Sequence, residues 1–301
     1  MYDIIIIGAG TAGMTAALYA RRASKTVLVF EKENIGGQIV YAQNIENYPA
    51  LKNISGSLFA SELFEQVEAL GADFEFRAVT GIRKNGDFFI VNAEKKDFSA
   101  KSIIIASGVK HRRLGVDKEE QFIGGGVSYC AVCDGAFFKN KDVAVVGGGN
   151  TALADAITLQ PICKKVYLIH RRDTFRGEEK LVEYIKKQPN IELVLNSNIT
   201  ALLGETFLEG IQIKNNKTRK ISSLILSGLF VAVGQEPSNH IFSNLVALDE
   251  NGFISSSESC TTSCPGIFVA GDCRAKEVRQ LSTAAADGAI AALCACKYQD
   301  I

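Results

Sequence analysis

The feature that most constrains the fold of this chain is a glycine-rich segment that occurs twice. Residues 4–13 read I-I-I-I-G-A-G-T-A-G, and residues 143–152 read V-A-V-V-G-G-G-N-T-A. In each copy a short apolar run, typical of a buried parallel strand, leads into an alanine-rich stretch of helical character. The two copies keep the same register, 139 residues apart, as far as Glu31 and His170. The chain therefore contains an internal repeat.

Each copy predicts a βαβ unit, with helices over 14–22 and 153–159 and second strands over 26–30 and 166–169. In such a unit the first glycine allows a tight turn, the second lets the backbone approach a pyrophosphate, and a small third residue lets the helix pack on the strand. Two such motifs in the strand–turn–helix context predict two dinucleotide-binding domains. The expected contacts are Gly8, Gly10, Thr11, Ala12 and Gly13 in the first turn and Gly147, Gly149, Asn150, Thr151 and Ala152 in the second.

The residues after the two second strands differ. Glu31 is an acceptor for ribose hydroxyls that repels a 2′-phosphate, which suits FAD or NAD. The matching place in the second unit holds His170, Arg171 and Arg172, and Arg176 follows one turn later. Because guanidinium groups pair bidentately with phosphate, the second unit should prefer NADPH over NADH. A solvated basic surface run is the alternative interpretation.

A third segment, residues 262–272, predicts an apolar strand that ends in Gly271 and Asp272. A carboxylate at the carboxyl end of a strand lies where doubly wound sheets bind ligands, although a plain strand and turn is the alternative. We expect Asp272 to return to the first nucleotide. The predicted fold is α/β, with two Rossmann-like three-layer domains, the second inserted in the first. Residues 1–111 and 244–301 would form the FAD-binding domain, residues 112–243 the NADPH-binding domain, and residues 83–98 a small accessory meander.

Cys130 and Cys133 form a Cys-x-x-Cys pair followed directly by Asp134. At a helix start, amide dipoles lower the pKa of a thiol, and this spacing lets two sulfurs meet as a reversible disulfide. An adjacent carboxylate could move the accompanying proton. The alternatives are a zinc half-site, an inert pair and a thioredoxin-like active site, but the chain has no second Cys-x-x-Cys, three His and no Trp. The pattern favours a relay from nicotinamide to flavin to disulfide.

Composition narrows the functional classes. Lys plus Arg and Asp plus Glu are both 33, so the formal charge is zero, which argues against a nucleic-acid or anionic-membrane partner. Eight cysteines in 301 residues are too few for a disulfide scaffold. Because no signal peptide or long apolar run is present, we expect a cytoplasmic protein. The other cysteines are predicted to be packing residues: Cys163, Cys260, Cys264, Cys273, Cys294 and Cys296.

In sequence order, these motifs resemble those of the low-molecular-weight, bacterial-type thioredoxin reductases over essentially the whole chain. The matching segments are 8–13, 36–38, 46–49, 130–135, 147–152, 170–176, 271–272 and 279–280. The resemblance implies a homodimeric FAD enzyme that uses NADPH to reduce the disulfide of thioredoxin or of a thioredoxin-like protein. It also implies that Cys133 meets the flavin, that Cys130 attacks thioredoxin and that Asp134 is the acid/base.

The resemblance extends the two nucleotide sites. It adds Gly36, Gly37, Gln38, Asn47, Gly271, Asp272, Arg279, Gln280 and Leu281 to the flavin site and Gly234 to the NADPH site. It also implies that the inserted domain rotates about short joints near Arg112 and Asn244.

One departure concerns the partner. The family commonly has an arginine where this chain has Gly125, so the docking contact that this arginine makes with thioredoxin is not implied by the resemblance. Phe137 and Phe138 are the remaining apolar docking candidates, with burial in the core as the alternative.

Other functions are less consistent with the sequence. Related flavoproteins that take electrons from ferredoxin, or that oxidise dithiols with oxygen, should lack the basic cluster. A non-catalytic flavoprotein would not need the thiol pair. The glutathione-reductase type is disfavoured because residues 1–111 contain no Cys and the last His is His240.

Overall fold

The computed structural model describes residues 1–42 and 44–299, and it divides into two compact units. The first comprises Met1–Lys110 and Glu236–Ile301, and the second comprises His111–Gln235. Residues 236–243, expected in the inserted domain, therefore belong to the first unit. Asn239 explains why: it is fully buried and its Nδ2 donates to the carbonyl oxygens of Gly252 at 3.0 Å and Cys273 at 2.8 Å. The last two residues of the expected 244–301 segment lie outside the described residues.

The first unit is built on one mixed sheet in the order β3-β2-β1-β6-β5-β4, with β17 also paired to β6. The ten-residue β6 belongs to both the antiparallel and the parallel part of the sheet. Its first half pairs antiparallel with β5, and its last three residues pair parallel with β17. The elements are β1 (Tyr2–Ile7), α1 (Thr11–Arg22), β2 (Val27–Phe30), η1 (Gly37–Tyr41), α2 (Gly56–Ala69), β3 (Asp73–Glu75), β4 (Val79–Asn85), β5 (Phe88–Ala93), β6 (Lys96–Ile105), η3 (His240–Phe242), β17 (Ile267–Val269), η4 (Gly271–Cys273) and α6 (Leu281–Gln299).

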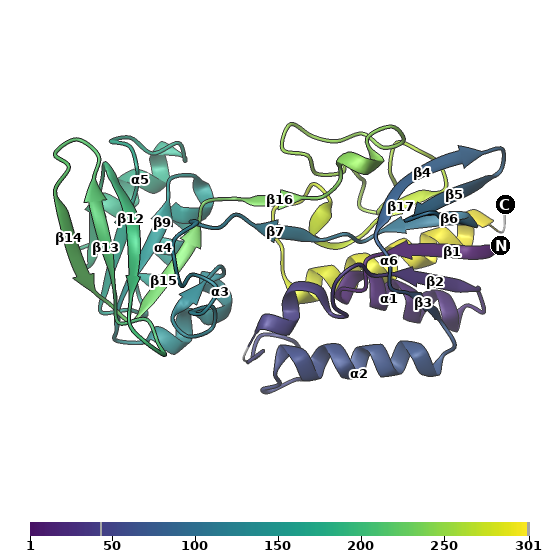
Figure 1. The fold of residues 1–301 in the computed structure, drawn as a ribbon, viewed down its shortest axis with the longest axis horizontal. Helices are drawn as coiled ribbons and strands as arrows, with labels where there is room; N and C mark the ends of the chain where they lie inside the picture. The colour runs from purple at the N-terminus through teal and green to yellow at the C-terminus, as the bar shows by residue number, and fades with distance from the viewer. Residues whose placement is uncertain (43, 300–301) are drawn as a thin grey trace. The chain divides into compact units, whose positions relative to one another are not determined.

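Alternation along the strands creates the layers of this unit, because successive side chains point to opposite faces of a sheet. Ile4 and Ile6 of β1 pack with helix residues such as Ala16 and Ala292. Ile5 and Ile7 belong instead to a cluster with Val91 and the rest of the β4–β5 meander. Figure 1 shows α1 and α2 on the side of β1–β3 opposite to β4 and β5. The predicted meander is confirmed, with the difference that its third strand continues into the parallel sheet.

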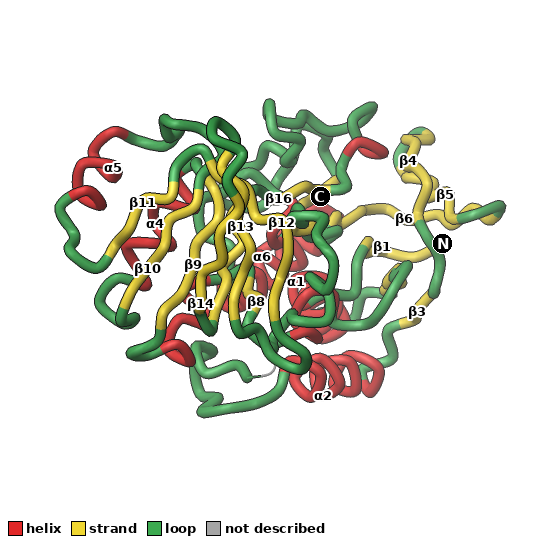
Figure 2. The backbone as a smooth tube through the Cα atoms, turned by 60° about the vertical axis from the view of Figure 1, so that its left-hand side comes forward, coloured by secondary structure: helices red, strands yellow, loops and turns green. Residues whose placement is uncertain are grey.

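The second unit repeats this plan with a parallel sheet in the order β11-β10-β9-β15-β8 and a separate antiparallel sheet of β12, β13 and β14. Alternate residues of β9 pack toward α4 or toward the antiparallel sheet. Figure 2 shows α4 and α5 beside strands β9–β11. The elements are β8 (Val127–Ser128), α3 (Ala131–Asp134), η2 (Gly135–Phe138), β9 (Asp142–Gly147), α4 (Asn150–Leu159), β10 (Lys165–Ile169), α5 (Glu179–Lys186), β11 (Ile191–Val194), β12 (Ser197–Leu203), β13 (Gly210–Asn215), β14 (Ile221–Ile225) and β15 (Gly228–Ala232).

Both predicted βαβ units are present, and each helix begins three residues earlier than expected, directly after the second glycine of its motif. The chain passes between the units through β7 (Val109–His111) and β16 (Gln235–Pro237), which pair as a two-stranded sheet. Across residues 1–42 and 44–299, no helix is long and apolar enough to span a membrane.

Candidate active site: two nucleotide turns and a disulfide

In the first nucleotide turn, residues 8–13 after β1 and at the start of α1, the three glycines have different roles. Gly8 has φ +110°, and a Cβ on it would lie 2.3 Å from the carbonyl oxygen of Ala106. A Cβ on Gly13 would lie 1.8 Å from the carbonyl oxygen of Gly8, so both glycines are required for packing. Gly10 is different, because the nearest described atom to an added Cβ is the carbonyl oxygen of Gly36 at 3.8 Å. No described side chain caps α1, whose first amides lack intrahelical acceptors, so the turn is open to a phosphate.

The carboxylate of Glu31 lies against this turn. Its Oε2 accepts from the amide of Ala9 at 2.9 Å, and its Oε1 accepts from the amides of Lys32 and Glu33 at 2.8 Å. Since each carboxylate oxygen has two acceptor positions, Oε2 keeps capacity for a ribose hydroxyl. The hydrogen bonds fix the orientation that such recognition needs.

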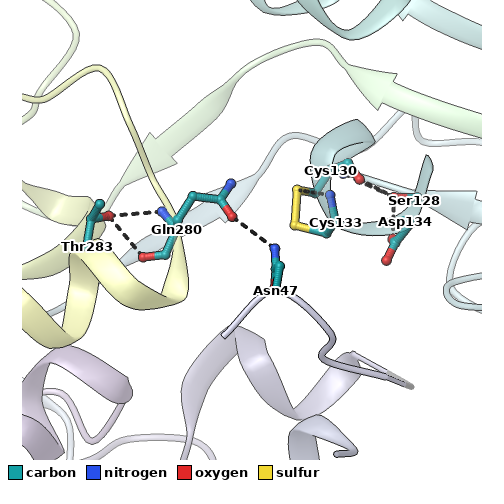
Figure 3. The surroundings of a disulfide bond; sticks show 7 residues. All are labelled: Asn47, Ser128, Cys130, Cys133, Asp134, Gln280 and Thr283. Atoms are coloured by element: carbon teal, nitrogen blue, oxygen red, sulfur yellow. Dashed lines mark hydrogen bonds between the residues drawn. A yellow bond between two sulfur atoms is a disulfide. The ribbon is translucent and has the colours of Figure 1, made fainter. Parts of the chain in front are cut away.

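Segments far apart in the sequence meet at two further points of the first unit. Gly36 lies beside Gly10, and its amide donates to the carbonyl oxygen of Ala9 at 2.8 Å, which places Gly37 and Gln38 at the start of η1. Nδ2 of Asn47 donates to Oε1 of Gln280 at 3.4 Å (Figure 3). Gln280 directly precedes Leu281, the first residue of α6. The first unit thus places the predicted segment 36–38 beside the first glycine turn, and it brings Asn47 to Gln280 at the start of α6.

Asp272 follows β17 and has an unsatisfied acceptor. Its side chain is 32% exposed, but its Oδ1 is buried and accepts no hydrogen bond from any residue in the described ranges. The ammonium of Lys276 lies 3.6 Å away, and Arg279 Nε donates to the carbonyl oxygen of Asp272 at 3.2 Å. Desolvation raises the pKa of Asp272, while Lys276 and Arg279 oppose that rise. Because an orphaned acceptor is costly, a hydroxyl donor would improve this site, and the sugar-alcohol chain of FAD supplies one.

The second nucleotide turn has the same division of tasks. A Cβ on Gly147 would lie 2.3 Å from the carbonyl oxygen of Ala232, whereas a Cβ on Gly149 would meet no described atom within 4 Å. The side chain of Asn150 exchanges hydrogen bonds with Glu178, at 2.8 Å to its amide and 3.1 Å to its carboxylate. Within the described residues, α4 has no side-chain cap either. Its first amides, which include those of Thr151 and Ala152, can therefore face a phosphate.

The residues of the predicted basic cluster differ in exposure. Arg171, Arg172 and Arg176 are exposed, and the amide of Arg176 donates to the carbonyl oxygen of Gly148 at 2.7 Å, which ties the cluster to the turn. His170 instead is 5% exposed and stacks on Phe175 at 5.1 Å.

Burial explains the different behaviour of His170. Its Nε2 lies 3.1 Å from the carbonyl oxygen of Thr174, and its ring occupies the space where a Cβ on Gly148 would stand, 2.0 Å away. Desolvation lowers the pKa of His170, which disfavours the charged ring. The structure therefore places His170 in a packing position beside the arginines. Gly234, the other residue assigned to this site, follows β15 with φ +119°.

Cys130 and Cys133 form a disulfide with an S–S distance of 2.09 Å (Figure 3). Cys130 caps α3, and its Sγ accepts from the amide of Cys133 at 3.2 Å. Ser128 links the pair to Asp134: its Oγ accepts from the amide of Cys130 at 3.1 Å and donates to Oδ2 of Asp134 at 2.6 Å. Burial raises the pKa of Asp134 and the Ser128 hydrogen bond opposes it. Two hydrogen bonds through Ser128 therefore connect the amide of Cys130 to the Asp134 carboxyl. The disulfide can undergo two-electron exchange, and the nearby carboxyl can hold the accompanying proton.

The sequence interpretation missed Ser128, whose only signal is its position two residues before the first thiol. Among the other cysteines, the thiols of Cys163, Cys260 and Cys273 are free and buried, and those of Cys264 and Cys294 are free and half-buried. Cys296 is also buried. Of the two docking candidates, Phe138 packs edge-on against Phe230 at 5.3 Å, while Phe137 is 41% exposed. Phe138 is therefore half-buried against the core of the second unit.

Comparison with known proteins agrees with this geometry. Residues 2–288 match the family described as pyridine nucleotide-disulphide oxidoreductase. The chain is 40% identical to the thioredoxin reductase of Treponema pallidum, over 99% of this chain and 97% of that protein, and 40% identical to that of Listeria monocytogenes, over 99% and 94%. The crystal structure of thioredoxin reductase from Streptococcus pyogenes superposes with a TM-score of 0.96 at 40% identity, covering 100% of this chain and 98% of that one. The chain therefore belongs to the pyridine nucleotide-disulphide oxidoreductase family.

Proposed function

We propose that this protein is an NADPH-dependent thioredoxin reductase that passes electrons through FAD and the Cys130–Cys133 disulfide to the disulfide of thioredoxin. The observation that carries the proposal is the disulfide linked through Ser128 to Asp134, in a unit that also has an open phosphate turn with exposed arginines. The curated relatives named thioredoxin reductase, at about 40% identity over the full chain, support the same activity.

We assign FAD to the first unit and NADPH to the second. The open turn at Gly10, the oriented Glu31 and the orphaned Oδ1 of Asp272 fit FAD. The open turn at Gly149 and the exposed Arg171, Arg172 and Arg176 fit the 2′-phosphate of NADPH. When bound, FAD accepts two electrons from NADPH and delivers them to the disulfide.

The roles of the thiols follow from the family pattern. Reduction breaks the Cys130–Cys133 bond and leaves two thiols. The Cys130 thiolate then attacks one sulfur of the thioredoxin disulfide, forming a mixed disulfide and releasing the other sulfur as a thiolate. Cys133 attacks the mixed disulfide, which restores the Cys130–Cys133 bond and releases reduced thioredoxin. Asp134 donates a proton to a departing thiolate, since its buried carboxyl holds a proton more readily than an exposed one.

The assembly and the location remain parts of this proposal. Exposed apolar side chains on three helices of the first unit, Tyr19, Leu58, Ile290 and Leu293, are suited to a homodimer contact. A reducing compartment such as the cytoplasm fits the free thiols of Cys163, Cys260, Cys264, Cys273 and Cys294 beside one redox disulfide. Sedimentation of the purified protein tests the dimer.

The deciding experiment is turnover of purified Cys133→Ser protein with NADPH and thioredoxin. We expect disulfide reduction to fall at least about 1,000-fold, because no resolving thiol is left, while NADPH still bleaches the flavin absorption. Cys294→Ser, at a half-buried free thiol, is the matched control and should keep full activity. Retention of thioredoxin reduction by the Cys133→Ser variant would refute the proposal.

The same assay can test the electron acceptor and the electron donor independently. A panel of thioredoxin-like proteins tests whether Gly125, in place of an arginine, has changed the partner. Reduction of the flavin by ferredoxin and not by NADPH would favour the alternative flavoprotein.

A further inference from the structure

The charged cluster behind the Gly271–Asp272 turn has no role in the reaction described above. Asp287 lies in the middle of α6 within an alanine-rich run and is 7% exposed. Its Oδ1 accepts from Arg274 Nη1 at 3.2 Å, and its Oδ2 accepts from Lys276 Nζ at 2.9 Å. Both cations are themselves buried, with about 10% and 9% of their side chains exposed. A buried carboxylate in this position is retained only where its partners compensate its desolvation.

The same carboxylate also holds backbone. Oδ2 of Asp287 accepts from the amide of Gly271 at 3.1 Å. Gly271 has φ +79°, a left-handed conformation that an external hydrogen bond helps to fix. The next residue is Asp272, whose Oδ1 is the orphaned acceptor of the flavin site. Lys276 lies between the two carboxylates, 2.9 Å from Asp287 and 3.6 Å from Asp272.

The neighbouring residue of α6 reaches the other half of the flavin site. A Cβ on Gly288 would lie 2.2 Å from the carbonyl oxygen of Ala12, so α6 touches the first turn of α1 at this point. A Cβ on Gly271 would lie 2.8 Å from Cβ of Ala12. Asp287 and Gly288 therefore join the pyrophosphate turn and the Gly271–Asp272 turn through two successive residues of one helix.

We propose that Asp287 is a positioning residue for FAD: by bridging the Gly271 amide, Arg274 and Lys276, it holds the Asp272 carboxylate in the place where FAD is bound. The inference rests on the assignment of FAD to the first unit. Removing the negative charge takes away the counter-ion that Arg274 and Lys276 share, which weakens the link between α6 and the segment that carries Asp272.

The test is the rate of FAD release from the Asp287→Asn holoenzyme, followed as the rise in flavin fluorescence after dilution, with reconstitution of the apoprotein as a second measurement. Asparagine keeps the shape and an acceptor for Gly271 but loses the charge. We expect release to be at least about 10-fold faster and FAD affinity to fall by a similar factor, while circular dichroism stays native. Asp97→Asn, which removes an exposed ion pair with Arg83 in the same unit, should change neither value more than twofold.

Each result is decisive. If the wild type binds no FAD, the proposed function fails; if the wild type binds FAD and Asp287→Asn retains it equally well, the positioning role fails. If Asp287→Asn does not fold, Lys276→Gln decides the matter, because it leaves Asp287 paired with Arg274. Faster FAD release from a folded Lys276→Gln protein supports the proposal, and unchanged release overturns it.

Discussion

The two nucleotide turns use one backbone device in two chemical settings. In both, a Cβ on the first glycine would lie 2.3 Å from a carbonyl oxygen at the end of the neighbouring strand: that of Ala106, directly after β6, for Gly8 and that of Ala232, the last residue of β15, for Gly147. In both, the second glycine is open. Folding therefore requires the first glycine of each turn, whereas the second glycine leaves space for the ligand to bind.

The settings differ at the end of the second strand. Glu31 accepts hydrogen bonds from two backbone amides of its own loop, Lys32 and Glu33, and from the amide of Ala9 in the glycine turn, so its charge faces inward. The arginines at the matching place project into solvent, and His170, in the register of Glu31, is buried. An inward carboxylate suits recognition of hydroxyl groups, while exposed guanidinium groups suit an added phosphate. Cofactor choice is therefore determined by the residues after the second strand and not by the glycine motif.

The strongest way to break this comparison is to fill the glycines one at a time. Gly8→Ala and Gly147→Ala should each lower the free energy of unfolding by about 3 kcal/mol or more, because the new methyl group meets a backbone oxygen. Gly10→Ala and Gly149→Ala should stay within about 0.5 kcal/mol of the wild type, yet weaken FAD or NADPH binding about 10-fold. Urea unfolding and cofactor titration measure the two effects. If the alanine variants at Gly10 and Gly149 lost as much stability as those at Gly8 and Gly147, the proposed difference between the first and second glycines would be wrong.

A smaller effect is expected from removing the charge that distinguishes the second turn. Replacing Arg171, Arg172 and Arg176 together by Gln should raise the KM for NADPH about 100-fold, because charge-assisted hydrogen bonds to the 2′-phosphate are lost. The KM for NADH should stay within about twofold, since NADH has no such phosphate. Lys220→Gln, an exposed cation elsewhere in the unit, serves as the control. A parallel loss for both nucleotides would show that the arginines act on folding or on a shared part of the ligand.

Features that depend on neighbouring residues could be predicted from the sequence, and contacts between distant segments could not. The two βαβ units and the disulfide pair depend on residues close together in the chain, so local patterns predicted them. The burial of His170 could not be predicted from the sequence, because only the fold shows that Gly148 leaves space for its ring. Asp287 was missed because its three partners lie 11–16 residues earlier and approach it only when α6 packs beside η4. A lone aspartate in an alanine-rich helix was the available signal.

The smallest expected effect lies at the point where the repeat itself diverges. In register, Asp155 of α4 takes the place of Ala16 of α1, which is fully buried. Burial raises the pKa of Asp155 to about 7, from 3.8. The folded protein therefore keeps a proton that the unfolded chain releases, and the resulting stability is present at low pH and is lost as pH rises through 7.

Between pH 6 and pH 8 this group should cost the folded wild type about 1 kcal/mol of stability. Asp155→Asn cannot ionise, so its free energy of unfolding should fall less over that range, and the variant should be the more stable protein at pH 8. Urea unfolding at pH 6, 7 and 8, without NADPH, measures the difference between the two proteins. That difference isolates Asp155 from Asp134, whose raised pKa contributes the same slope to both. If the two curves stay parallel, Asp155 is ionised throughout, and α4 presents to solvent the position that α1 buries.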